Sequence, residues 1–250
     1  MTGGPSRRPK YETIADVLRA AIDAGEYQPG DRLPGENPLA AEHGVAVMTA
    51  RQALNALKNE GLAESRRGAG FFVRSFQPIR RRGIARLAQE VWGSGESIFS
   101  ADDNRPLTAE SEVLGAVLPP EPVAAVLGID PGGSVFARAR RHIVDGRPVL
   151  LSTSYLPYDL VEGSAITRSD TGQGGIYARL AELGHGPTHF REELRVRMPS
   201  ADDSARLHLS STTPVIKISR TAYTEAGRAV EVNEMTLDSL AYVLEYDFEA

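Results

Sequence analysis

The chain has 250 residues, of which 41% are hydrophobic and 24% are charged, and its formal net charge is -5. These values are typical of a globular protein with one or two domains. The absence of cysteine excludes disulfides and thiolate metal sites. No apolar run approaches the roughly 20 residues of a membrane span, and the N-terminus lacks the apolar core of a signal peptide. We therefore expect a cytoplasmic protein without a membrane segment.

The charge is distributed unevenly along the chain. Residues 1–82 carry 13 Lys and Arg against 9 Asp and Glu, whereas residues 83–250 carry 15 against 24. This asymmetry favours an N-terminal part that faces a polyanion and a larger C-terminal part that avoids it.

The N-terminal part predicts three helices and a hairpin. An apolar stripe with helical spacing predicts a helix over residues 11–24, and a short helix is expected from Glu36 to Gly44. Thr49 and Gln52 match a capping box, so the next amphipathic helix should begin at Thr49 or fray before it, and it should end at Gly61. Extended runs at 62–67 and 71–74, joined by a glycine-containing tip, complete a winged helix-turn-helix.

A linker is expected over residues 76–93, with a short helix from 84 to 92. It contains Arg80, Arg81 and Arg82, which either contact DNA or pair with acidic residues of the C-terminal part. The predicted domains are therefore 1–75, which binds DNA, and 94–250, which follows the linker.

The C-terminal part is predicted to be an antiparallel sheet with a few helices, an α+β domain. Alternating stretches predict strands at 108–117, 135–144, 149–156, 189–197, 215–223, 229–238 and 242–247, and helices fit 121–127, 176–183 and 201–209. Asp145-Gly146 is a hairpin turn signal between two of these strands. The five histidines lack metal-ligand spacing with a nearby carboxylate, and no catalytic or phosphate-binding motif is present. We predict no metal, no cofactor and no catalytic residues.

The N-terminal block resembles the DNA-binding domain of the GntR family of bacterial repressors. The resemblance rests on Tyr11, Ile14, Ala15, Leu18, Arg19, Ile22, Gly30, Asp31, Leu33, Pro34, Glu36, Leu39, Ala40, Val45, Thr49, Arg51, Ala53, Leu54, Leu57, Gly61, Leu62, Gly68, Gly70 and Val73. It implies that the DNA-binding residues are Tyr11, Arg32, Glu36, Thr49, Arg51, Gln52, Arg66, Arg67 and Gly68.

The chain departs from this family at the start of the recognition helix. Relatives usually have serine and then arginine where this chain has Ala46 and Val47, and neither of these side chains can cap the helix or hydrogen-bond a base. Arg51 should therefore carry most of the base reading, because arginine makes the bidentate contact to guanine. Gln52 is a second candidate, as an adenine reader, and Thr49 is expected to bind phosphate.

The C-terminal part resembles the effector-binding UTRA domain, which has a chorismate-lyase-like fold. The matching segments include Arg138 to His142, Asp145-Gly146, Ser154 to Pro157 and Glu231. Together the two halves resemble the HutC subfamily of GntR regulators. This implies a homodimeric repressor that binds a pseudo-palindromic operator in double-stranded DNA and responds to a small-molecule effector. The alternatives are a chorismate-lyase-like enzyme and a DNA-binding protein without a ligand.

The same resemblance implies an effector site formed by Ser97, Arg140, His142, Ser152, Ser154, Tyr155 and Glu231. In the amino-sugar-phosphate sensors of this subfamily, an R-x-R pair and a glutamate hold the ligand. Those positions fall on Arg140, His142 and Ser152, so one arginine and the glutamate are missing. We expect a polar or acidic effector, but not high affinity for N-acetylglucosamine 6-phosphate.

Overall fold

The computed structural model describes residues 8–66, 68–83, 85–96, 98–99 and 102–248. The chain divides into two compact units, Met1–Gln77 and Pro78–Ala250. Each unit has its own buried apolar core, and each is described separately below.

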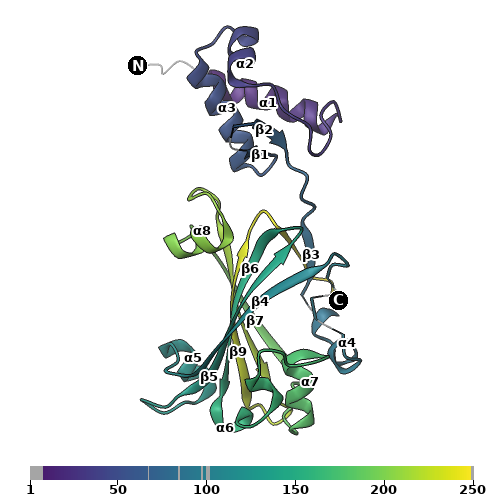
Figure 1. Ribbon diagram of the computed structural model, residues 1–250, viewed down its shortest axis with the longest axis vertical. Coiled ribbons are helices and arrows are strands. Elements are labelled where there is room, and N and C mark those ends of the chain that lie inside the picture. Colours follow the sequence, from purple (N-terminus) through teal and green to yellow (C-terminus); the bar gives the residue numbers. More distant parts are fainter. Residues whose placement is uncertain (1–7, 67, 84, 97, 100–101, 249–250) are drawn as a thin grey trace, which may run out of the picture. The chain divides into compact units, whose positions relative to one another are not determined.

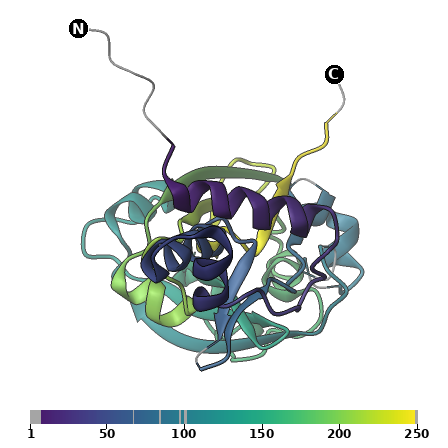
Figure 2. The same cartoon turned by 90° about the horizontal axis from the view of Figure 1, so that it is seen from above.

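Unit 1 contains the three helices and the hairpin that the sequence predicts. These are α1 (Lys10–Asp23), α2 (Glu36–His43), α3 (Val47–Asn59), β1 (Ala63–Arg66) and β2 (Gly70–Val73) (Figure 1). The buried face of α1, which carries Ile14, Ala15 and Leu18, belongs to the core that α3 completes. Helix α3 packs against both α1 and α2 (Figure 2). Gly44 has a φ of 58° and ends α2, a conformation that glycine adopts without a steric cost.

Helix α3 begins two residues before the expected capping box. Ala46 is its extended N-cap residue and supplies no side-chain hydrogen bond. The Thr49 amide donates to the Ala46 carbonyl at 2.9 Å, so Thr49 lies inside the first turn. The prediction that the helix begins at Thr49 was therefore wrong. Burial of Ala50, Ala53, Leu54 and Leu57 stabilises the helix without a polar cap.

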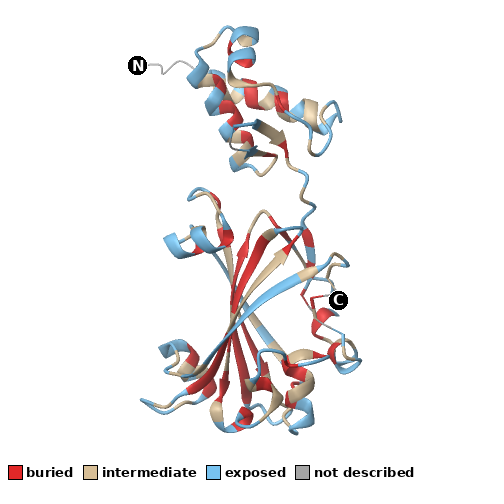
Figure 3. Cartoon of the chain, viewed as in Figure 1, coloured by how far each residue is buried: buried red, intermediate tan, exposed pale blue. Residues whose placement is uncertain are grey.

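Unit 2 is built on a six-stranded sheet in the order β4-β5-β6-β9-β8-β7, in which all neighbours are antiparallel. The strands are β4 (Leu107–Val117), β5 (Val135–Val144), β6 (Arg147–Pro157), β7 (His189–Arg197), β8 (Val215–Tyr223) and β9 (Ala229–Asp238). Asp145 and Gly146, with φ of 51° and 72°, form the turn between β5 and β6. The inner strands are buried and edge strand β4 is largely exposed (Figure 3). The predicted α+β class is confirmed.

Helices cover both faces of this sheet (Figure 1). On one face, α4 (Gln89–Gly93), α6 (Tyr158–Val161), α7 (Gly175–Glu182) and the 3-10 turns η1 (Ala85–Leu87) and η2 (Ala165–Thr167) surround an apolar cluster. On the other face lie α5 (Glu121–Leu127) and α8 (Ala201–Leu207), each over its own small cluster.

Most of the predicted linker belongs to unit 2. Residues Ile79–Arg82 form strand β3, which pairs in parallel with β10 (Tyr242–Glu245) in a separate two-stranded sheet. The sequence had suggested that residues 242–247 belong to the large antiparallel sheet, and this prediction was wrong. Arg80 and Arg82 pair with Glu245, and Arg81 is buried against Glu192. Of the two alternatives for the arginine run, the structure supports pairing with acidic residues of the C-terminal part.

Candidate functional site

Arg51 and Glu36 form a bidentate ion pair on the surface of unit 1. Arg51 Nε and Nη2 donate to the two Glu36 carboxylate oxygens at 2.8 and 2.9 Å. The Glu36 carboxylate raises the pKa of Arg51 and fixes the orientation of its guanidinium group. The Arg51 side chain is 52% exposed, so it remains accessible to a partner. To contact a guanine through the same edge, Arg51 must exchange the carboxylate for the base.

The first turn of α3 presents apolar side chains to solvent. Val47 is 42% exposed and Met48 is 60% exposed, and Gln52 is also exposed, whereas Thr49 is half-buried. Sequence reasoning treated Val47 only as the loss of an arginine and did not consider Met48. An apolar side chain at this position can contact the methyl group of thymine in the major groove.

The wing carries one described arginine close to its glycine tip. Arg66 donates to Glu64 at 2.8 and 3.0 Å, and its guanidinium lies 4.2 Å from the centre of the Phe72 ring. Gly68 has a φ of 74°, and apart from its chain neighbours no described residue has an atom within 4 Å of the position a Cβ would take, so the tip is open to an approaching backbone. Arg67 lies outside the described residues.

The two remaining predicted DNA contacts differ in their surroundings. Arg32 is exposed, and its backbone pairs with that of Phe72 in the wing strand β2 through an isolated antiparallel β-bridge. Tyr11 is half-buried against the core of unit 1, and its hydroxyl donates to Glu12 at 3.2 Å. The structure thus places Arg32 beside the wing, while Tyr11 has a packing role in addition to any contact with DNA.

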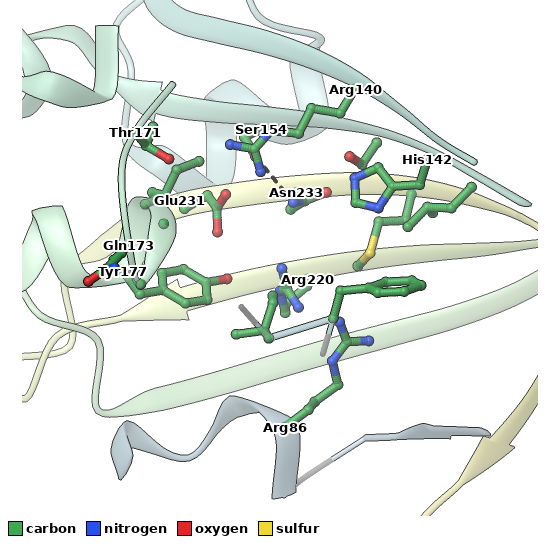
Figure 4. A pocket seen from close by; sticks show the side chains of 18 of the residues that line it. Arg86, Arg140, His142, Ser154, Thr171, Gln173, Tyr177, Arg220, Glu231 and Asn233 are labelled. Carbon is green, nitrogen blue, oxygen red and sulfur yellow. Dashed lines mark hydrogen bonds between the residues drawn. The ribbon is translucent and has the colours of Figure 1, made fainter. Parts of the chain in front are cut away.

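Unit 2 contains a partly open cavity of about 280 Å³ between the sheet and the α7 side of the fold. Strands β5, β6, β8 and β9 contribute its floor, and the loop from Thr171 to Gly175 and the start of α7 contribute its cover (Figure 4). Gly174 fits this cover because it has a φ of 75° and because a Cβ there would lie 2.4 Å from the Trp92 carbonyl oxygen. The lining residues include Arg86, Phe99, Arg140, His142, Ser152, Ser154, Tyr177, Arg220, Glu231, Asn233 and Met235.

Strand register explains why polar residues from distant parts of the sequence meet in this cavity. One row of directly opposed residues crosses five strands, and it consists of Arg138, Ser154, Asn233, Arg220 and Glu192. A second row begins with Arg140, Ser152 and Met235. Opposed residues in a sheet project to the same face, so Ser154, Asn233 and Arg220 of the first row meet Arg140, Ser152 and Met235 of the second in the cavity floor. Arg138 and Glu192, at the two ends of the first row, are not among the residues that line the cavity.

Burial controls the charges in the cavity. It lowers the pKa of Arg140, and together with the charges of Arg140 and Arg86 it lowers the pKa of His142 to about 3. His142 is therefore neutral near pH 7, with its ring 5.9 Å from that of Phe99. Burial also raises the pKa of Tyr177, which keeps the hydroxyl protonated.

Several buried polar atoms at this site have no hydrogen-bond partner within the described residues. They are both ring nitrogens of His142, Nε and Nη1 of Arg220, Nε of Arg86, Oη of Tyr177, Oδ1 of Asn233 and Oε2 of Glu231. An unsatisfied buried donor or acceptor costs roughly 1–3 kcal/mol, so a ligand that supplied the missing bonds would stabilise the fold. The cavity can thus accept a small polar molecule.

The cavity contains five of the seven effector residues expected from the sequence, namely Arg140, His142, Ser152, Ser154 and Glu231. Tyr155 does not line it, because successive strand residues alternate between faces and its side chain packs against the α5 cluster on the opposite side of the sheet. Ser97 lies outside the described residues. Sequence reasoning missed Arg86, Tyr177, Arg220 and Asn233 as cavity residues, and it identified residues 172–175 only as a loop.

Within the ranges that the structure covers, no group of three or more His, Asp or Glu side chains is placed to hold a metal ion. The described helices are also all too short or too polar to cross a membrane.

Comparison with known proteins finds two family models on this chain. Residues 10–73 match the gntR family of bacterial regulatory proteins, and residues 104–242 match the UTRA domain. An uncharacterized HTH-type transcriptional regulator of Streptomyces coelicolor is 31% identical, covering 97% of this chain and 94% of that protein. The HTH-type transcriptional repressor NagR of Bacillus subtilis is 29% identical, and the match covers 89% of this chain and 88% of that protein.

Solved structures agree with these matches. The crystal structure of PhnF from Mycobacterium smegmatis is similar with a TM-score of 0.56 and 25% identity, covering 95% of this chain and 99% of that one. The chain therefore belongs to the GntR family of bacterial regulatory proteins and is a DNA-binding transcriptional regulator with a C-terminal UTRA effector domain.

Proposed function

We propose that the protein is a cytoplasmic homodimeric repressor of the HutC subfamily, without enzymatic activity, whose affinity for its operator changes when a small molecule binds in unit 2. Two winged helices would contact a pseudo-palindromic site with half-sites about one helical turn apart. Arg51 reads a guanine in each half-site, and the wing contacts phosphates.

The observation that supports this proposal most strongly is the polar cavity in unit 2. It is partly open, and its wall contains buried donors and acceptors that lack partners within the described residues. In a chain that also has a DNA-binding unit, such a cavity is best explained as a sensor site. The ligand can change DNA affinity only by the difference in its affinity for the two states of the protein.

The test has two parts. Footprinting on the protein's own promoter region should show a protected pseudo-palindrome, and a panel of polar metabolites should contain compounds that raise the melting temperature. A ligand present at about 100 times its Kd should stabilise the folded chain by roughly 2.7 kcal/mol. The same ligand should shift operator affinity and remain chemically unchanged. Turnover of the ligand would contradict the proposal in favour of an enzyme.

The identity of the cavity residues also limits the effector. A neutral His142 cannot offer the charged planar fork of an arginine to a phosphate, and Ser152 is shorter than a glutamate. Calorimetry should therefore show no micromolar binding of N-acetylglucosamine 6-phosphate. Tight binding that is lost in Arg140→Ala would mean that these two substitutions do not limit the site.

A further inference from the structure

The floor of the unit 2 cavity changes from polar to apolar along the strands. Three successive rows of directly opposed residues cross β5, β6 and β9, each two residues further along the strands than the row before, so all three face the same side of the sheet. On the cavity side these rows contain, in order, Ser154 and Asn233, then Arg140, Ser152 and Met235, then His142, Leu150 and Leu237. The third row contains no charged side chain at neutral pH.

Four side chains form the cavity wall at this third-row end. They are Phe99, His142, Leu150 and Met235, of which the three apolar ones are almost fully buried. The rings of Phe99 and His142 lie 5.9 Å apart and are inclined at 64°, so they form a corner of two aromatic surfaces. A flat ring placed in such a corner can stack on one surface and meet the other with its edge, and a methionine sulfur is a favourable neighbour for it.

His142 belongs to this apolar wall in spite of its two nitrogens. Burial and two nearby arginines lower its pKa to about 3, so the ring is uncharged near pH 7. Both ring nitrogens are buried and make no hydrogen bond with the described residues. The imidazole therefore presents an uncharged aromatic surface to the cavity.

The charged groups near this end are compensated elsewhere. Arg140 and Arg86 are the charges that act on His142. Arg86 is paired with the buried Asp102 at 2.8 Å. Arg140 interacts with the opposite charge of Glu231, and Figure 4 shows its guanidinium turned away from His142. Neither arginine makes the third-row end a place for a charged group.

We propose that the end of the cavity formed by Phe99, His142, Leu150 and Met235 is an apolar subsite, and that it binds an uncharged aromatic group of the effector. This proposal rests on the proposed function and specifies the ligand class of the same cavity. With about 280 Å³, the cavity exceeds the roughly 150 Å³ in which an apolar protein cavity holds benzene, so it has room for a ring and a polar part together. A sugar, which is polar all round, would leave hydroxyl groups without partners at this end. The effector is thus amphipathic, with its polar groups at the first row.

Toluene tests this proposal because it carries the aromatic group alone. It is titrated into the full chain in sealed cells while the melting temperature is recorded, and glycerol, which carries only hydroxyl groups, is titrated in parallel. The wild type should be stabilised by toluene in a saturable manner, because a ligand that binds only the folded chain raises its stability. Glycerol at the same concentrations should have a smaller effect.

Two neighbouring substitutions on β6 separate the subsite from general solvent effects. Ser152→Leu places an apolar side chain in the cavity and fills the space beside Met235, so it should weaken the apparent affinity for toluene at least about tenfold. Thr153→Leu makes a similar change one residue further along, where the side chain lies on the opposite face of the sheet. This matched variant should respond to toluene like the wild type.

The wild type also permits a measurement that needs no variant. The chain has five histidines, and the ring signals of His142 in a proton NMR spectrum should be those that do not titrate between pH 5 and 8, since its pKa is about 3. A toluene ring bound in the corner should shift these signals through its ring current. The signals of the other four histidines should not move.

The proposal is overturned if toluene fails to stabilise the wild type, if Ser152→Leu and Thr153→Leu respond equally, or if the His142 signals do not shift. Because these titrations contain no DNA, they are independent of the proposed function. A chain that binds its operator but ignores toluene refutes only the apolar subsite, whereas one that binds toluene at His142 but binds no operator refutes only the repressor.

Discussion

Arg51 combines two properties that a base-reading residue needs, an exposed guanidinium and a neighbour that fixes its direction. Arg51→Ala should reduce operator affinity roughly 5- to 150-fold and relax specificity at one base pair of each half-site. Binding isotherms against operators substituted at each position would measure both effects. A loss of the same size on every sequence, including random DNA, would show that Arg51 contacts only phosphate.

Met48 is more exposed than any other apolar residue of α3 that the structure describes, and it lies in the first turn. We expect it to contact a thymine methyl group in the operator. Replacing that thymine by deoxyuridine removes only the methyl group and should weaken binding of the wild type. The same replacement should have no further effect on Met48→Ala. Equal losses for both proteins at every thymine would exclude this contact.

His142 makes the stability of unit 2 dependent on pH. Its pKa is lowered to about 3 by burial and by the charges of Arg140 and Arg86, whereas an unfolded histidine titrates near 6.5. Between these values the unfolded chain binds a proton that the folded chain does not, so stability is full above about pH 6.5 and falls as the pH decreases towards 3. The contribution approaches about 1.4 kcal/mol for each pH unit.

Urea unfolding at several pH values between 7 and 4 measures this effect. Carboxylates titrate in the same range, so the relevant quantity is the difference between the wild type and His142→Gln. The wild type should lose stability more steeply as the pH falls. Parallel curves for the two proteins would show that His142 is protonated in the folded state as readily as in the unfolded state.

The wing is an element whose contribution to DNA binding should not depend on sequence. Arg66 and Arg67 directly precede Gly68 of the open tip in the chain, and Arg66 is exposed. Replacing both by alanine should weaken binding to all DNA. It should also reduce the slope of log affinity against log salt by the amount expected for the loss of roughly one to two phosphate contacts per winged helix. An unchanged slope would argue against any wing contact with phosphates.

Elements with regular periodicity could be predicted from the sequence, and elements fixed by distant partners could not. Strands β5, β7, β8 and β9 have the expected bounds, because alternation of polar and apolar residues directly reflects the two unlike faces of a strand. Strand β3 reads Ile-Arg-Arg-Arg, which resembles a charged linker. It becomes a strand because β10, about 160 residues away, supplies its hydrogen bonds and Glu192 neutralises Arg81.

The effector site shows the same limit. Arg140 and Glu231 could be assigned to the site through resemblance to a family. The assignment of Arg220 requires the strand register, because nothing in the sequence of a single strand shows that Arg220 pairs with Asn233. Tyr155 was misplaced for a related reason. It follows Ser154 directly, so the two side chains lie on opposite faces of β6, and only Ser154 reaches the cavity.

At the scale of the whole molecule, the two units have separate cores, and unit 2 is closed by the last strand of the chain. Deleting residues 241–250 removes β10 and leaves Ile79 and Arg81 of β3, both almost fully buried, without their cover. Unit 2 should unfold at a lower temperature, while unit 1 keeps its melting transition. Limited proteolysis should release a resistant fragment ending near residue 77. Simultaneous loss of both units would mean that they fold as one cooperative block.

The pairing of β3 with β10 also determines the order of events during synthesis. Unit 1 is complete once residue 77 has left the ribosome, but β3 must wait for a strand that is translated about 160 residues later, or roughly 8 to 33 s at 5–20 residues per second. Throughout that interval the nascent chain has a folded DNA-binding unit 1 and an incomplete effector-binding unit 2. Premature termination of translation would therefore produce a DNA-binding fragment that no effector can control. Removal of truncated products thus matters more for this regulator than for a protein whose effector domain folds first.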